Sequence, residues 1–157
     1  MDDFTALILA AAAAYAVVAL VWYIILVVAN WKIFTKAGEA GWKSIIPFLN
    51  NYVLYKISWN TKMFWVSLGA TALAAVFSSL AGENGGFLSV LSLICSVALI
   101  VITVMQVHKL SKSFGHGIGF TLGLIFLSPI FTLILGFGKS EYIGPDGVRN
   151  GNNSSEL

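Results

Sequence analysis

The sequence predicts an all-α integral membrane protein: a four-helix bundle with one interfacial or re-entrant helix between helices one and two. Of its 157 residues, 58% are hydrophobic and only 10% are charged, whereas a soluble domain carries about 25% charged residues. One core cannot bury that apolar surplus, so much of it must face lipid. In addition, four segments of the chain lack Asp, Glu, Lys and Arg. Each reaches the roughly 20 residues that a membrane-spanning helix needs.

These segments set the expected helix boundaries. They are Phe4–Trp31, Met63–Gly82, Asn84–His108 and Ser113–Gly138, and we expect helices over about 4–30, 63–81, 87–110 and 119–137. A signal peptide is the competing interpretation of the first segment. However, Asp2 and Asp3 stand where a basic region belongs, and the apolar segment is about twice the usual length. We therefore expect a membrane domain over 1–138, followed by a flexible polar tail over 139–157.

Lysine placement predicts the orientation, because basic residues near helix ends stay in the cytoplasm. The connection after the first helix carries five lysines and the connection after the third carries Lys109 and Lys112, whereas the loop Gly82–Gly86 has none. We expect a multi-pass membrane protein, with both basic loops in the cytoplasm and both termini outside.

The stretch 42–59 is too short and too polar to cross a membrane comfortably. Ser44 suits a helix cap, Pro47 suits a first helical turn, and Trp42 and Trp59 suit the lipid headgroup level. An interfacial or shallow re-entrant helix fits this composition best. A fifth crossing would move the second basic loop to the wrong side.

Residues that carry chemistry are few, so we expect no enzyme, no cofactor and no metal site. Cys95 stands alone in the third helix and is most simply a small apolar residue. His108 and His116 have no second His, Cys or carboxylate at ligand spacing. The four spans contain no Asp, Glu, Lys or Arg, which disfavours an ion-coupled pump. Topology explains the lysines, so the expected surroundings are the lipid bilayer and no nucleic acid.

A polar face runs along the third predicted helix. Its members recur at steps of three, four and seven residues, and Ser67, Thr71 and Ser78 repeat similarly in the second helix. Small and hydroxylated residues let helices approach closely and hydrogen-bond, so internal packing is the simpler interpretation. The alternative is a polar path between the two helices, which would need an oligomer. The face consists of Ser89, Ser92, Ser96, Thr103 and Gln106.

The fourth predicted helix carries glycines and hydroxyl residues spaced by four, a pattern typical of a face that contacts a neighbouring helix. Pro129 should kink this helix, while Ser128 or Thr132 satisfies the carbonyl that the kink frees. The contact is either internal or between subunits of a homo-oligomer. The expected packing residues are Gly115, Gly119, Gly123, Ser128, Thr132 and Gly136.

Two segments resemble the signature blocks of a known family. The first, Lys36–Tyr52, reads KAGEAGWKSIIPFLNNY, and the second begins at Lys112–Phe120 and continues through Pro129 to Pro145. They are similar to those of small bacterial multi-pass membrane proteins of unknown function, whose related regions also precede signal peptidase I catalytic domains. The resemblance covers about Trp31 to Pro145, without a family pattern near the loop between helices two and three. It implies the fold and a bacterial membrane, but no reaction.

The two blocks also share a layout. Each has a lysine, then glycines, then an apolar segment containing proline, and Lys36–Trp42 matches Lys112–Ile118 in spacing. A duplicated unit would explain this layout, and in transporters such repeats form binding sites at their interface.

These expectations rank three classes of function. First comes a non-enzymatic accessory or scaffold protein that packs against another membrane protein or against itself. The alternative is an oligomeric channel or small-solute uptake protein that uses the polar faces. An intramembrane enzyme is weakest, because no nucleophile, base and orienting group can be placed together. The candidate ligand or partner contacts, all expected at the cytoplasmic boundary, are Glu39, Asn50, Asn51, Tyr52 and His116.

Overall fold

The computed structural model describes residues 3–81 and 86–148, and its regular elements there are all helical. They are α1 (Asp3–Lys36), the 3-10 helix η1 (Gly41–Ser44), α2 (Pro47–Ser58), α3 (Thr61–Ala81), α4 (Phe87–Ser113), α5 (Ile118–Phe126), α6 (Ser128–Phe137) and the 3-10 helix η2 (Pro145–Gly147). The all-α class is therefore confirmed. Of the described helices, α1, α3 and α4 are long and apolar enough to cross a membrane.

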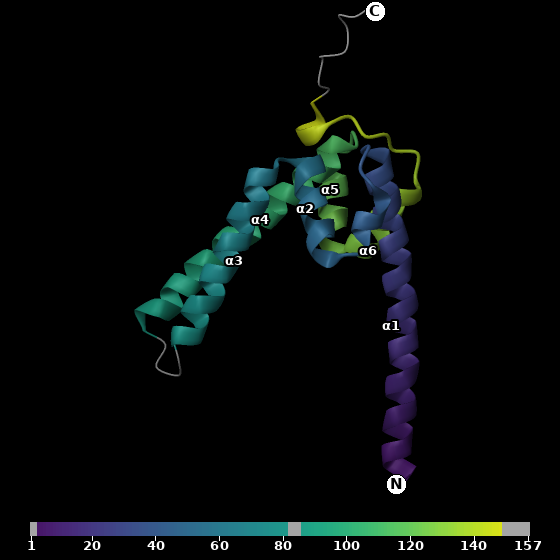
Figure 1. Ribbon diagram of the computed structural model, residues 1–157, viewed down its shortest axis with the longest axis vertical. Coiled ribbons are helices and arrows are strands. Elements are labelled where there is room, and N and C mark those ends of the chain that lie inside the picture. Colours follow the sequence, from purple (N-terminus) through teal and green to yellow (C-terminus); the bar gives the residue numbers. More distant parts are fainter. Residues whose placement is uncertain (1–2, 82–85, 149–157) are drawn as a thin grey trace, which may run out of the picture.

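The molecule has a packed head and two projecting legs (Figure 1). The head contains α2, α5 and α6 together with the adjoining ends of α1, α3 and α4. One leg is the amino-terminal part of α1, in which every residue from Asp3 to Ile24 is exposed. The other leg is the hairpin of α3 and α4. Most of the loop predicted between these two helices lies outside the described residues.

The fourth predicted crossing, 119–137, is two helices instead of one. The backbone leaves the helical region at Leu127, with φ −125° and ψ 41°, just before α6 starts with Pro129 in its first turn. Proline has no N–H to donate and its ring clashes with the preceding turn, so a helix readily ends there. The chain then doubles back, because His116 before α5 and Ser140 after α6 are joined by a hydrogen bond of 2.8 Å. Both ends of the α5–α6 hairpin therefore lie at the head.

The stretch 42–59 also reverses the direction of the chain. The Tyr23 hydroxyl donates to the carbonyl oxygen of Ile45 over 3.3 Å. Tyr23 lies about 20 Å along α1 from its last residue, so the chain has turned back along α1 before α2 begins. Ile46, and not Ser44, occupies the cap position of α2. The stretch 42–59 is therefore a turn back along α1 followed by the helix α2, and its depth in a membrane stays a prediction.

Two halves of the chain, α1–η1–α2 and α4–α5–α6, are built alike. Each long helix ends before a glycine with left-handed backbone, since Gly38 and Gly115 both have φ 75°. The next residue donates its N–H to a carbonyl five positions back, as Glu39 does to Phe34, which is the Schellman way of ending a helix. In each half the chain then reverses and a helix begins with proline in its first turn. The resemblance seen between the two sequence blocks thus extends to their structure.

The shorter proline-bearing helix of each half packs on the long helix of the other half. Helix α1 packs against α6, and α4 packs against α2. The Lys32 ammonium lies 4.7 Å from the centre of the Phe137 ring at the end of α6, and the Lys109 ammonium lies 4.9 Å from that of Trp59 at the end of α2. Each lysine stands six residues before the left-handed glycine of its own half. Equivalent cations therefore sit over aromatic rings of the opposite half.

The core lies where the halves meet. Ile33 and Leu110 each stand five residues before the left-handed glycine, and Val53 and Leu135 each stand six residues after the helix-starting proline. All four are buried in one cluster. The head is therefore held by two equivalent pairs of apolar side chains. The cluster is completed by Phe34, Ile57 and Phe114.

The row of glycines predicted for helix packing divides among different environments. At Gly136 a Cβ atom would lie 2.6 Å from the carbonyl oxygen of Ala29, so α6 touches the α1 backbone there. At Gly123 a Cβ atom would meet the Phe131 ring inside the α5–α6 hairpin. Gly119 is exposed with nothing within 4 Å of that position, so the structure does not show the packing role predicted for it. Gly115 instead ends α4.

These environments predict different changes in the free energy of unfolding when one methyl group is added. Gly136→Ala should lower the free energy of unfolding by about 1–3 kcal/mol, because the Ala29 backbone cannot move aside as a side chain can. Gly119→Ala is the matched control and should cost nothing, since alanine also favours the helical backbone. Thermal unfolding of the purified protein in mild detergent measures both. Equal losses in the two variants would contradict the assigned α1–α6 contact.

Candidate functional site

The head carries the lysines of the chain. They lie in or next to the ends of α1, α2, α3, α4 and α6 that meet there (Figure 1). The far ends of the two legs carry none within the described residues. The lysines are Lys32, Lys36, Lys43, Lys56, Lys62, Lys109, Lys112 and Lys139.

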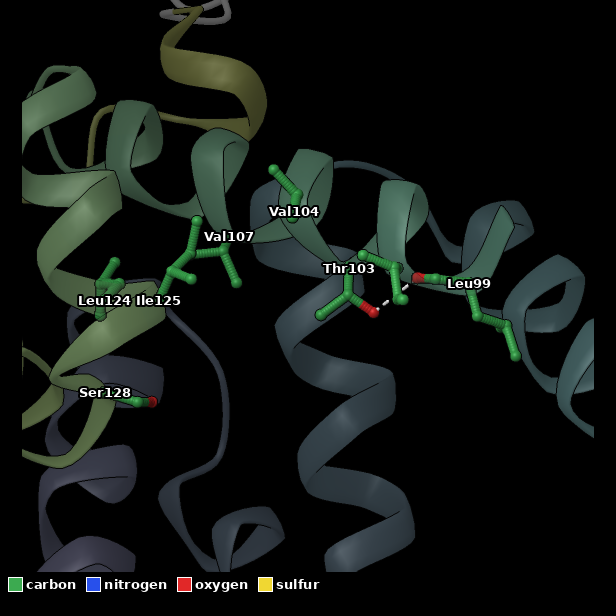
Figure 2. A pocket seen from close by; sticks show the side chains of 8 residues that line it. Leu99, Thr103, Val104, Val107, Leu124, Ile125 and Ser128 are labelled. Atoms are coloured by element: carbon green, nitrogen blue, oxygen red, sulfur yellow. Dashed lines mark hydrogen bonds between the residues drawn. The ribbon is translucent and has the colours of Figure 1, made fainter. Parts of the chain in front are cut away.

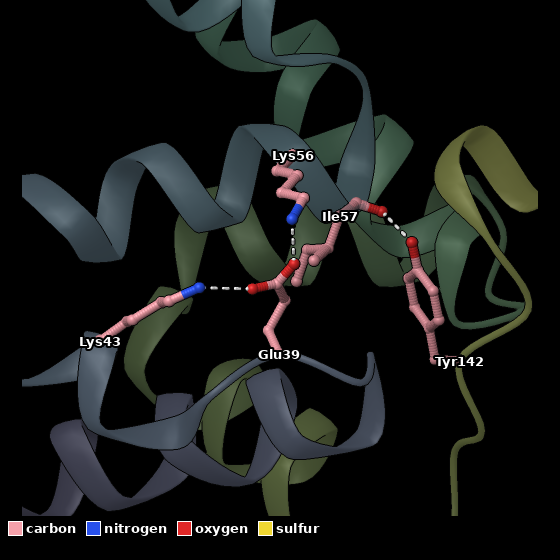
Figure 3. Close-up of polar contacts among 5 residues, drawn as sticks. All are labelled: Glu39, Lys43, Lys56, Ile57 and Tyr142. Atoms are coloured by element: carbon pink, nitrogen blue, oxygen red, sulfur yellow. Dashed lines mark hydrogen bonds and ion pairs between the residues drawn. The ribbon is translucent and has the colours of Figure 1, made fainter.

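A buried carboxylate joins three segments of the first half. Glu39, which follows the end of α1, accepts from Lys43 of η1 over 2.7 Å and pairs with Lys56 of α2 over 2.5 Å (Figure 3). Its side chain is only 12% exposed. Burial alone would raise the pKa of Glu39, but the hydrogen bonds and charges of the two lysines outweigh burial and hold that pKa below its usual value. The carboxylate is therefore charged at neutral pH and ties the reversed chain to α1.

The chain after α6 packs over the head as a strap, defined here as residues 138–148. The Tyr142 hydroxyl donates to the carbonyl oxygen of Ile57 over 2.8 Å (Figure 3). Asp146 pairs with Lys109 of α4 over 2.6 Å. Burial, helped by the negative charge of Glu39, raises the pKa of Tyr142 to about 12, so this hydroxyl remains a donor at neutral pH. Residues 139–148 thus belong to the head, unlike the flexible tail predicted over 139–157, whose remainder lies outside the described residues.

A lysine from the first half ends a helix of the second. The Lys36 ammonium donates to the carbonyl oxygens of Leu135 and Gly138 over 2.7 and 2.8 Å. Carbonyls in the last turn of a helix lack intrahelical donors and carry partial negative charge, so a cation is favourable there. This contact fixes the end of α6 beside the end of α1.

The five candidate ligand contacts do not converge on one site. Glu39 lies in the lysine cluster, whereas His116 stacks on Phe120 with ring centres 4.1 Å apart. Tyr52 packs edge-on against Phe64 of α3 with centres 5.4 Å apart. The other two residues share the first turns of α2 with Tyr52. They are Asn50, whose buried side-chain oxygen has no hydrogen-bond partner within the described chain, and Asn51, which is exposed.

The histidines serve as structural links. His108 of α4 shares a hydrogen bond of 3.0 Å with Thr121 of α5, and His116 bonds Ser140 of the strap. Within residues 3–81 and 86–148 no three His, Cys, Asp or Glu side chains gather closely enough to hold a metal ion.

Two hydroxyls of the polar face of α4 form hydrogen bonds with carbonyls of the same helix. The hydroxyls of Ser96 and Thr103 donate to carbonyls one turn back, over 2.9 and 2.8 Å. Ser92 reaches across to the carbonyl oxygen of Ala74 in α3 over 3.3 Å. Gln106 is buried and donates to the Ser58 hydroxyl of α2 over 3.3 Å. Ser92 and Gln106 thus bond to neighbouring helices as the packing interpretation expects, whereas Ser96 and Thr103 bond only within α4.

Two adjoining hollows open between α4 and the α5–α6 hairpin. The larger, about 460 Å³, is an apolar groove lined by side chains of α4 and α5 together with Ser128 (Figure 2). The smaller, about 110 Å³, is a cavity that adds polar groups of α1, α4 and α6, namely Asn30, Gln106, Ser128 and Thr132. Ser128 and Thr132 therefore line this cavity, although the sequence suggested that they pack against a helix. Asn30 was missed, and its position as a lone amide inside an apolar segment was the available signal.

A family model described as a family of unknown function (DUF5684) matches residues 42–145. The matched segment runs from η1 to the strap and includes most of both sequence blocks, so the family resemblance read from those blocks is confirmed. No curated protein and no solved structure matches the chain.

The Glu39 cluster predicts a pH-dependent contribution to stability. Because the folded-state pKa of Glu39 is lowered, its stabilisation is complete above its ordinary pKa of 4.5 and is lost as the pH falls through the lowered value. Glu39→Gln should therefore cost about 1 kcal/mol at neutral pH, with a difference from the parent that shrinks in acid. Thermal unfolding across this pH range measures the effect. Glu141→Gln, at an exposed carboxylate, is the control, and a pH-independent Glu39→Gln effect would refute the assignment.

Proposed function

We propose that this chain, which belongs to the DUF5684 family of unknown function, is a non-enzymatic scaffold protein that binds another membrane protein. The observation that carries the proposal is the free leg of α1. From Ala6 to Trp22 every residue of this leg is exposed, although α1 is long and apolar enough to span a membrane. A spanning helix that is exposed over several turns offers that surface to helices of other proteins.

The composition of the leg suits helix pairing. Alanine fills positions 10–14, and Tyr15 follows directly after these small residues. Within lipid, helices associate mainly through close packing and hydrogen bonds, which small residues allow because backbones can approach. The base of the leg is held rigidly, since Gly136 of α6 touches Ala29 and Lys36 binds the end of α6. The head thus fixes one end of α1 and leaves the remainder available for binding.

The lysines support an orientation with the head at the cytoplasmic side of a bacterial cell membrane. Basic residues near helix ends remain inside, and all the lysines gather at the head. Three crossings by α1, α3 and α4 then leave Asp3 outside. Because the α5–α6 hairpin returns to the head, the strap lies inside, in contrast to the expectation of both termini outside.

The alternative is an oligomeric channel or small-solute uptake protein built on the polar faces of α3 and α4. It has less support, because Ser92, Ser96 and Thr103 spend their hydrogen bonds on backbone carbonyls. Pairing of α1 with α1 of a second copy would be the first step toward such an oligomer.

Site-specific photo-crosslinking in intact cells tests the scaffold role. A photoreactive amino acid at Val18 of α1 should yield one discrete adduct with another membrane protein, because α1 is exposed on all sides around this position. The same amino acid at Leu93 of α4 is the matched control, since the two positions are 67% and 63% exposed. Lipid adducts alone at Val18 would refute the scaffold role. An adduct only with a second copy would replace it with self-assembly.

A further inference from the structure

We propose that the polar cavity and the adjoining apolar groove together bind a membrane amphiphile with one long chain and an uncharged head group that bears a hydroxyl. The site lies between α4 and the α5–α6 hairpin, away from the exposed leg of α1. The proposal therefore stands independently of the scaffold role.

The cavity determines the chemistry of the head group. Its polar lining consists of two amides and two hydroxyls, from Asn30, Gln106, Ser128 and Thr132, and no charged side chain lines it. Gln106 is only 8% exposed, Asn30 and Thr132 are half-buried, and Ser128 is exposed where the cavity meets the groove. A hydroxyl can both donate to and accept from such groups. A charged head group would lose its hydration without finding an opposite charge, which is far more costly.

The depth of the cavity points to a molecule that arrives from the membrane. Gln106 lies about 10 Å along α4 from the last residue of that helix, so it stands deeper than the lysines near the helix end. Ile33, Leu110 and Leu135, which line the cavity, belong to the buried core of the head. The groove offers the more direct route, because it shares Val107, Leu124 and Ser128 with the cavity.

The groove is suited to an alkyl chain. Figure 2 shows Leu99, Thr103 and Val104 of α4 along one side, with Ile125 of α5 across from them. The Thr103 hydroxyl donates to the Leu99 carbonyl over 2.8 Å, so its polar atom is already satisfied. A chain whose head group occupies the cavity would thus lie along α4 toward the leg. Any lipid chain fits such a groove, so the cavity supplies the selectivity.

The position of the site within the two halves supports the assignment. The cavity is lined by Ile33 and Leu110, the equivalent core residues of the two halves, together with groups from α2, α5 and α6. It therefore lies at the interface of the related units, where internally repeated membrane proteins place their ligands.

Photolabelling of the purified full-length protein in nanodiscs tests the proposal. The probes are a long-chain fatty alcohol with a mid-chain diazirine and the fatty acid of the same length and label, at a pH at which the acid is ionised. We expect the alcohol to label the groove, and the acid to label it about tenfold less at equal concentration, because the carboxylate finds no counter-charge. Equal labelling by the two probes would overturn the proposal, since the groove would then accept chains as bulk lipid does.

Variants locate the head group. Thr132→Val and Ser128→Ala each remove one hydroxyl from the cavity, and together they should reduce labelling by the alcohol about five- to tenfold. Ser79→Ala, an exposed serine of α3, is the matched control and should leave labelling unchanged. Undiminished labelling of the cavity double variant would also refute the site.

A second variant keeps the test decisive if the double variant is unstable. Ile100 lines the groove and is 64% exposed, so Ile100→Trp fills the groove without entering the core. It should abolish labelling of α4 and α5 by the alcohol while leaving the unfolding temperature unchanged. Retained labelling in this folded variant would show that the chain does not occupy the groove.

Discussion

The structure depends on the exchange of packing partners between two similar halves. Each half has a long helix that ends in a left-handed glycine and a shorter helix that starts with proline. Because the shorter helix packs on the long helix of the other half, neither half can bury its apolar side chains alone. Ile33, Val53, Leu110 and Leu135 meet at this crossing. The lysine contacts at the helix ends follow the same exchange, since Lys36 of the first half binds the end of α6.

This arrangement concentrates packing at one end of the molecule and leaves two apolar legs beyond it. In the head, Lys36 and Tyr142 of the strap satisfy backbone carbonyls at helix ends, and the Glu39 cluster pairs its charges internally. The legs carry mainly apolar and hydroxyl side chains, the kinds of surface that membrane partners and lipid contact. The proposed scaffold role uses the free leg of α1. The proposed amphiphile site uses the boundary between the head and the leg of α4.

The sequence predicted the three long helices well because absence of charge over about 20 residues is a local property. It did not predict the α5–α6 hairpin, since hydropathy measures how apolar a segment is and not whether its backbone is continuous. Pro129 indicated a kink, but reversal depends on distant partners such as Lys36 and Ser140. Likewise, Gly119 and Gly136 each belong to a series spaced by four, yet of the two only Gly136 meets a neighbouring backbone. Glu39 was recognised as a candidate contact, whereas its two lysine partners required the fold.

We propose that the chain crosses the membrane three times and that the α5–α6 hairpin enters and leaves on one side. Single cysteines at Asp3 and Ser140, each in the Cys95→Ala background, test it by labelling with an impermeant thiol reagent in intact cells and in inverted vesicles. With three crossings, we expect the cysteine at position 3 to react only from outside and the one at position 140 only from inside. Labelling of both positions from the same side would show that residues 118–137 cross the membrane, which would contradict the three-crossing topology.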